Sequence, residues 1–325
     1  MSARERLLHS AKRQAHSVFA VYALLYALCA VEDNYMSGVA MAIVLAAAFL
    51  HAGWNYLLKK SQGKIVFVWW FLLISMALYL PMFLYYWPQT TIPLLGWSCV
   101  VATGLLHGLY FWFLGGAYQR GDLSLVYPLS RGSGPLFVPF LAAGLIHERL
   151  FLFGILGIAL VIAGIYIIHL RSFSGQSFLE PFLAFRGGAS LWALCTGGTI
   201  AAYSLVDKVG VGIVYPPVYI YLMFVLAWLF LSPYVLVKER TLLKEEWHMN
   251  KGTILVLGFL VLFTYMMILF ALRMNKVSYV VAVREVSIVF SALYGIVWLG
   301  EKHARQKFVG AVLIALGVAF IGLSR

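Results

Sequence analysis

One arginine in this sequence lies inside an apolar stretch together with two prolines. Arg131 follows Pro128 by three residues and precedes Pro135 by four, so on a helix the three share a face. A guanidinium offers a planar fork of N–H donors that fits a carboxylate or a phosphate. Pro128 and Pro135 remove backbone donors, and the helix breaks that result are tolerated where a helix lines a cavity. The pattern predicts that Arg131 binds an anionic group beside a broken helix; a structural pairing with a carboxylate is the alternative.

A second charged pair, Arg284 and Glu285, also lies within an apolar stretch. On a helix, Arg284 shares its face with Ser287 and Ser291, and this face is polar and small, unlike one that contacts lipid. Charge at membrane depth is costly, so it has a partner or a function. Two interpretations stay open: Arg284 contacts the same anionic group as Arg131, or the pair is structural or forms a gate, for which Glu285 is the candidate.

Further polar candidates form a stripe of three residues spaced by four, His51, Asn55 and Lys59. His51 can take up a proton near neutral pH, which would allow coupling to protons, or it can simply hydrogen-bond between helices. Trp54 and Tyr203 occupy equivalent places in an internal repeat described below. His51, Trp54, Asn55 and Tyr203 are therefore candidates for contact with a bound molecule, and Lys59 is expected at the membrane surface.

Two other groups have simpler explanations. Asp207 and Lys208 are adjacent and are expected to form a solvated pair. His107, Tyr110 and Trp112 either frame an aromatic pocket or belong to the aromatic belt at the membrane surface.

The composition indicates an integral membrane protein. The chain has 325 residues, of which 63% are hydrophobic and 11% charged, and its mean hydropathy is +0.90. A soluble domain of this size cannot hide so much apolar surface, whereas a bilayer accepts it. The net charge of +12 comes from Lys and Arg at the ends of apolar segments, where lipid headgroups lie, so nucleic-acid binding is not expected. The three cysteines lie in apolar stretches without a CxxC pattern, which predicts neither a disulfide nor a metal site.

Ten apolar segments are long enough to cross a bilayer as helices. They are residues 38–58, 65–87, 93–117, 122–146, 150–170, 188–206, 216–237, 252–274, 277–299 and 306–324. Most connections are short. The longest, about 171–187, is expected along the membrane surface, and the charged connection 238–251 on the cytoplasmic side.

The N-terminal segment has several interpretations. Four basic residues precede a short apolar run at 18–31. This pattern resembles the start of a signal peptide, but the run could also be a marginal eleventh helix, or translation could begin at Met36. Most Lys and Arg outside the spans fall on the side of the connection between the first two helices. The positive-inside rule places that side in the cytoplasm, which fits if 18–31 also spans the membrane.

The two halves of the chain resemble each other. Residues Ala52–Lys59 align with Ala201–Lys208, and Ala117–Ser124 align with Ala271–Ser278. Each half contains five expected helices. Because five is odd, the halves must cross the membrane in opposite orientations, as in secondary transporters built from inverted repeats.

The last helix of each half also matches. The matched residues are Glu148 with Glu301, Gly157 with Gly310, and Gly164 with Gly317. A carboxylate at a helix start suits the helix dipole, so both glutamates are expected to cap the helices that they precede. The glycines permit close packing, either within the chain or in a homodimer.

These motifs resemble a known family. Ala117-Tyr118, Gly121-Asp122-Leu123-Ser124, Tyr127-Pro128-Leu129 and Glu148-Arg149-Leu150 are similar to the EamA domain of the drug/metabolite transporter superfamily, as are Ala282–Ser287 and Leu299-Gly300-Glu301-Lys302 in the second half. The resemblance covers about 37–325. It implies ten helices, cytoplasmic termini, and export or exchange of metabolites. The loop charges depart from that orientation, and the N-terminal extension departs from that length.

The sequence therefore predicts an all-α integral membrane protein with ten transmembrane helices in two inverted five-helix EamA-like repeats. We expect an N-terminal extension at 1–36, a first repeat at 37–171, a linker at 172–187 and a second repeat at 188–325. The chain is expected in the cytoplasmic membrane, the inner membrane of a bacterium, in contact with lipid.

The predicted function is a secondary transporter, an exporter or exchanger of a small polar metabolite, anionic or zwitterionic, that works by alternating access. No catalytic residue, cofactor, metal or nucleic acid is expected, because no HExxH, G-x-S-x-G or P-loop pattern is present. A membrane scaffold or sensor that transports nothing is the alternative, followed by a membrane-embedded enzyme.

Overall fold

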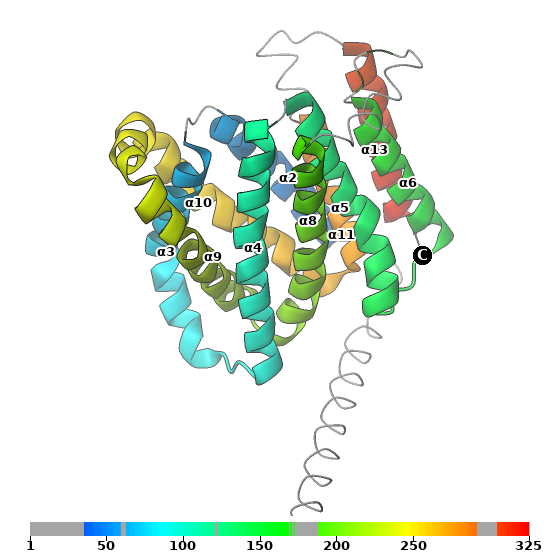
Figure 1. The fold of residues 1–325 in the computed structure, drawn as a ribbon. Helices are drawn as coiled ribbons and strands as arrows, with labels where there is room; N and C mark the ends of the chain where they lie inside the picture. Colours follow the sequence, from blue (N-terminus) through cyan, green and yellow to red (C-terminus); the bar gives the residue numbers. More distant parts are fainter. Residues whose placement is uncertain are drawn as a thin grey trace, which may run out of the picture.

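The computed structural model describes residues 36–59, 63–120, 123–168, 170, 172, 188–290 and 304–324, and each regular element among them is helical (Figure 1). The first half contains α2 (Gly38–Lys59), α3 (Lys64–Tyr86), a short 3-10 turn (Trp87–Gln89), α4 (Leu94–Arg120), α5 (Leu123–Leu145) and α6 (Leu152–Ile168). The second half contains α8 (Gly188–Ile213), α9 (Pro216–Lys238), α10 (Arg240–Met274), α11 (Val277–Arg284) and α13 (Ala304–Gly322). The predicted N-terminal segment and most of the linker at 172–187 lie outside the described residues.

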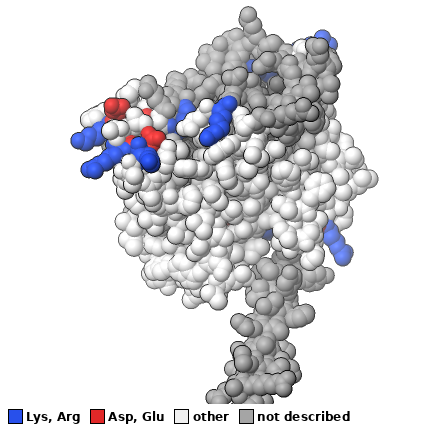
Figure 2. Space-filling model, viewed as in Figure 1, with Lys and Arg blue, Asp and Glu red and all other residues white. Residues whose placement is uncertain are grey.

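Among the described residues, six helices are long and apolar enough to cross a bilayer: α3, α4, α8, α9, α10 and α13. Two shorter apolar helices, Gly38–Gly53 and Leu152–Ile168, add to them. Figure 2 shows Lys, Arg, Asp and Glu gathered mainly at one end of the visible face and few of them over its broad middle. A multi-pass membrane protein is the architecture that these features indicate.

Three expectations about helix boundaries were wrong. The charged connection expected at 238–251 forms the first turns of α10, which begins at Arg240. The ninth expected span is interrupted, because α11 ends at Arg284, Glu285 forms a turn, and the chain is helical again at 286–290. The break expected at Pro128 and Pro135 is absent, since α5 is one helix through both residues. Each proline removes one N–H, and the helix continues on either side.

The two halves interlock rather than pack as separate bundles. The helix α2 of the first half packs on α10 and α11 of the second, and α8 of the second half packs on α4 and α5 of the first. Likewise α3 packs on α10, and α4 packs on α9. Each of these pairs has its counterpart when the two halves are exchanged. The central helices are thus arranged with approximate two-fold symmetry, as two related repeats require.

The helices α6 and α13 pair at one side of the bundle (Figure 1). A Cβ atom on Gly157 would lie 2.6 Å from the carbonyl oxygen of Gly317, and one on Gly164 would lie 2.7 Å from that of Gly310. Replacing each glycine by its equivalent in the other repeat turns one contact into the other. The earlier glycine of α6 meets the later glycine of α13, and the later glycine of α6 meets the earlier one of α13. The last helices of the repeats are therefore antiparallel, and their matching glycines serve packing within the chain.

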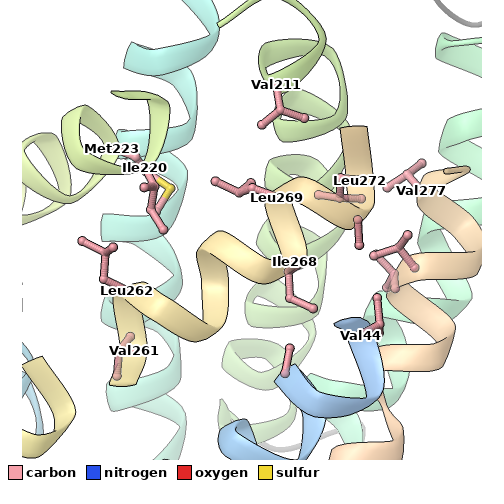
Figure 3. Packing of buried hydrophobic residues seen from close by; sticks show 14 of the residues in the cluster. Val44, Val211, Ile220, Met223, Val261, Leu262, Ile268, Leu269, Leu272 and Val277 are labelled. Carbon is pink, nitrogen blue, oxygen red and sulfur yellow. The ribbon is translucent and has the colours of Figure 1, made fainter. Parts of the chain in front are cut away.

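The apolar core follows α10, which runs between α9 on one side and α2 and α11 on the other (Figure 3). Leu262 and Leu269 of α10 are fully buried, as are Met223 of α9, Val44 of α2 and Val277 of α11. Because lipid is as apolar as these side chains, tight packing rather than water exclusion holds such helices together. The core fixes the helices that carry the polar side chains described below.

A capping contact joins the halves at the start of α11. After α5, His147 adopts a left-handed backbone conformation with φ of 55°, and the amide of Glu148 donates to the carbonyl of Ala142 at 3.1 Å. This turn directs Glu148 toward α11, where its carboxylate accepts the amides of Val277 (2.9 Å) and Ser278 (3.2 Å). The expectation that Glu148 caps its own following helix was wrong. It caps a helix of the other repeat.

Candidate functional site

A cavity lies at the centre of the two repeats, with an empty volume of about 700 Å³ that includes its opening to the outside. Eight of the described helices line it: α2 to α5 and α8 to α11. Its polar lining residues are His51, His107, Tyr110, Arg131, Tyr203, Thr264, Tyr265 and Arg284. The remaining lining residues are apolar, among them Leu72, Phe111, Phe224 and Ile268. Ligand sites in helical membrane proteins are commonly apolar cavities of this kind with a few polar groups.

Arg131 of α5 is 5% exposed and is held by three side chains from two other segments. Its Nη2 donates to Nε2 of His51 on α2 at 2.5 Å and to the hydroxyl of Ser287 at 3.5 Å. Its Nε lies 3.6 Å from Oε2 of Glu285. Because an arginine only donates, His51 accepts at Nε2 and carries its proton on Nδ1. Arg131 and His51, which the sequence offered as separate candidates, are therefore in direct contact.

Arg284 of α11 shares the same carboxylate, since its Nε lies 3.7 Å from Oε1 of Glu285. Arg284 is 4% exposed and Glu285 is 1% exposed. Two guanidiniums face one carboxylate, so the cluster carries one excess positive charge. Among the described residues, the Nε and Nη2 atoms of Arg284 have no hydrogen-bond partner. Buried donors without a partner are uncommon, and here they belong to a side chain that lines the cavity.

Another part of the lining is aromatic. The His107 ring of α4 stacks on Tyr203 of α8, with centroids 4.1 Å apart, and meets Tyr265 of α10 edge-on at 5.2 Å. Tyr203 also lies close enough to Arg284 for the charge of the guanidinium to act on its hydroxyl. His107 and Tyr110 thus lie at the cavity as the pocket interpretation expected. Trp112 does not, because it packs against Tyr234 of α9 at 4.7 Å.

The expectation of a solvated pair at 207–208 was wrong, because both side chains are buried. Asp207 accepts hydrogen bonds from Thr103 at 2.5 Å, from Tyr219 at 2.9 Å and from Tyr265. Lys208 instead donates to two carbonyl oxygens at the end of α10, those of residues 272 (3.0 Å) and 275 (2.7 Å). Sequence reasoning missed Asp207. The available signal was its place six residues before the end of α8, inside a long apolar helix.

The other predicted site residues are placed as follows. Trp54 and Asn55 lie in α2, and their side chains lie outside the described part of the chain, as does that of Pro128 in α5. Pro135 is buried on α5. No group of three His, Cys, Asp or Glu side chains that could hold a metal ion occurs among the described residues. Two arginines, of which Arg284 has free N–H donors, and several aromatic side chains line a largely apolar cavity, an arrangement that can bind a small molecule with an anionic group.

Comparisons with known proteins match both halves of the chain. A model described as the EamA-like transporter family matches residues 36–170 and 188–323. A solved structure titled only "Crystal structure of protein" is 16% identical and superposes with a TM-score of 0.67, covering 90% of this chain and 99% of that one. At this identity the likeness concerns the fold alone. A comparison with curated proteins found no match.

Proposed function

Because the chain belongs to the EamA-like transporter family, we propose that it is a secondary transporter of a small polar metabolite that carries an anionic group. It works as an exporter or exchanger in the cytoplasmic membrane of a bacterium, by alternating access between two repeats that comprise about 37–171 and 188–325. Members of the family are transporters rather than enzymes.

The observation that carries the proposal is the pair of buried arginines that share Glu285 at a central cavity. A buried guanidinium without full hydrogen bonding is unfavourable, and an anion that accepts its N–H groups relieves this cost. The excess positive charge selects for an anion and disfavours a cation. Arg284 supplies the free donors, while His51 and Ser287 hold Arg131 in position.

The mechanism rests on the interlocked repeats. The cavity lies between helices of both halves, so a tilt of one set of helices against the other would close it on one side and open it on the other. The turn at Glu285 divides the polar helix of the second repeat, whereas α5 is continuous. We propose that this difference makes α11 and residues 286–290 the moving element and Glu285 the gate between the two arginines.

The proposal is tested by anion binding to the purified protein in detergent. Melting temperatures are measured against a panel of small carboxylates, organophosphates and amines for the wild type, Arg131→Ala, Arg284→Lys and Arg284→Gln. A ligand at 100 times its dissociation constant stabilises by about 2.7 kcal/mol, which a melting curve resolves. Arg240→Gln is the matched control, because Arg240 is exposed at the start of α10.

We expect an anion to raise the melting temperature of the wild type and of Arg240→Gln, to act more weakly on Arg284→Lys, and to have no effect on Arg284→Gln and Arg131→Ala. Lysine retains the charge but lacks the planar fork. Equal stabilisation of all variants would mean that the arginines are structural. Stabilisation by no compound would favour a scaffold or sensor, and chemical turnover of a panel compound would favour an enzyme.

A further inference from the structure

A second polar cluster adjoins the cavity, centred on Asp207 of α8. The carboxylate is 0% exposed and accepts three hydroxyl hydrogen bonds, from Thr103 of α4, Tyr219 of α9 and Tyr265 of α10. An ionised carboxylate only accepts hydrogen bonds, so three hydroxyl donors suit its charged form. The arrangement can therefore hold one negative charge close to the cavity.

Thr103 connects this carboxylate to an imidazole. Nδ1 of His107 lies 2.9 Å from the backbone carbonyl oxygen of Thr103 and 3.1 Å from its hydroxyl oxygen. A carbonyl oxygen only accepts, so Nδ1 carries a proton, and Nε2 of the neutral ring holds a lone pair. Among the described residues, Nε2 is buried without a hydrogen-bond partner, and His107 lines the cavity. A nitrogen atom that can accept a proton, Nε2 of His107, therefore lies in the cavity wall with no hydrogen bond to break first.

His51 does not offer such an acceptor. Its Nε2 receives the N–H of Arg131 at 2.5 Å, so a proton can add there only if that contact breaks. His51 thus serves to hold Arg131, and the proton-binding capacity suggested by its chemistry is found at His107 instead.

The fold itself does not require the cluster around Asp207. The alignment that pairs Ala52–Lys59 with Ala201–Lys208 places Leu58 opposite Asp207. Extending the match of Ala117 with Ala271 along the same helices without a gap places Leu257 and Val261 opposite Thr103 and His107. The acid lies in the second repeat and the imidazole in the first, and in each case the other repeat carries an apolar side chain at the equivalent place. The polar side chains are thus an addition to the common fold, which points to a function of their own.

We propose that His107, with Asp207 as its counter-charge, is the proton-binding site that couples transport to protons; this rests on the proposed transport of an anion. A proton from water in the cavity bonds to Nε2. The Nδ1–H of the imidazolium then donates to Thr103, whose hydroxyl donates to the carboxylate of Asp207. Release reverses the step. His107 stacks on Tyr203, which lies beside Arg284, so a positive charge on His107 strengthens the field that attracts an anion. One proton and the anion then bind together and cross in the same transport step, so that the proton offsets one negative charge of the anion.

The titratable groups that face His107 and Asp207 come from every helix packed around them. They are Cys99 on α4, Tyr203 on α8, Tyr219 on α9, Tyr265 on α10 and Arg284 on α11, while Arg131 on α5 and His51 on α2 line the same cavity. The other carboxylate near these groups, Glu285, faces the two arginines instead. Asp207 is therefore the group that can balance an added proton on His107.

The proton site is tested directly by solid-state NMR of the full chain in lipid bilayers with ¹⁵N-labelled histidine, from about pH 5 to about pH 9. The signals absent from His107→Gln identify His107. We expect its Nε2 signal to change from the lone-pair to the N–H form within this range, and Asp207→Asn to weaken proton binding by about tenfold through loss of the counter-charge. His248→Gln is the control, because His248 is exposed on α10. A His107 signal that keeps one form across the whole range, or that is indifferent to Asp207→Asn, would overturn the proposal.

Coupling is tested in liposomes that contain a pH-sensitive dye, with gradients of acetate, succinate, citrate or glycerol 3-phosphate. In the wild type, anion flux should be accompanied by proton flux. In His107→Gln, the anion should still move down its gradient while the associated proton flux is lost. Unchanged proton flux in His107→Gln would refute the coupling role and leave the proposed transport intact. If the wild type moves no anion, the proposed function fails for these compounds, and the NMR titration alone decides the proton site.

Discussion

The contact between α6 and α13 allows a quantitative prediction for Gly317→Ala. A Cβ at this position would lie 2.6 Å from the carbonyl oxygen of Gly157, 2.8 Å from a side-chain carbon of Val161 and 2.9 Å from its backbone nitrogen. A favourable carbon–oxygen contact needs about 3.3 Å, so the helices must separate by about 0.7 Å. Two of these three atoms belong to the backbone, and the third belongs to a branched side chain on a helix, so none of them can rotate away. We expect a loss of about 1–3 kcal/mol, the usual cost of overpacking.

The assay is thermal unfolding in detergent, followed by tryptophan fluorescence. Gly144→Ala is the matched control, because a Cβ on Gly144 of α5 would meet nothing within 4 Å. Alanine is the better helix former, so this variant should melt at or slightly above the wild-type temperature. Gly157→Ala should resemble Gly317→Ala, since the two glycines contact each other. Wild-type melting of Gly317→Ala would refute the account of α6 and α13 as a closely packed pair of repeat-equivalent helices.

Two further predictions concern buried charges at the ends of helices. Glu148→Gln should lower the free energy of unfolding by about 1–2 kcal/mol, because a neutral amide oxygen then replaces the carboxylate that accepts two backbone amides of α11. The control Glu245→Gln, at an exposed position, should melt as the wild type does. Lys208→Met should cost about 1–3 kcal/mol, because two carbonyl oxygens at the end of α10 lose their donor, and Lys244→Met at an exposed position should cost little. Melting curves of the four variants decide both, and equal stability within either pair would contradict the corresponding cap.

Much of the fold follows from apolar periodicity and the repeat. The positions of α2, α3, α4, α5 and α9 agree closely with apolar runs of spanning length, whereas α8 continues to Ile213, beyond the expected end at residue 206. The start of α10 was predicted too late because a hydropathy pattern cannot detect the polar turns by which a helix extends beyond the membrane. The interruption at Glu285 was missed for a different reason: nothing in the neighbouring sequence is a proline or a glycine, so the turn depends on tertiary contacts.

The site was only partly predictable. Arg131, Arg284 and Glu285 were found because a charge inside an apolar run needs a partner, and they do contact one another. The sequence could not show that Asp207 is buried, because the sixth span was ended one residue before it and Lys208 beside it suggested an ion pair in water. Its hydroxyl partners come from three other helices, and no spacing within α8 reveals them.

The central claim is that the cavity between the repeats carries an anion across a bilayer through its buried arginines. It is tested most directly by uptake of radiolabelled succinate, citrate and glycerol 3-phosphate into liposomes that contain the wild type, Arg284→Gln or Arg240→Gln. We predict that the wild type and Arg240→Gln accumulate at least one of these anions well above protein-free liposomes, and that Arg284→Gln does not. Equal uptake by Arg284→Gln and the wild type would contradict the claim.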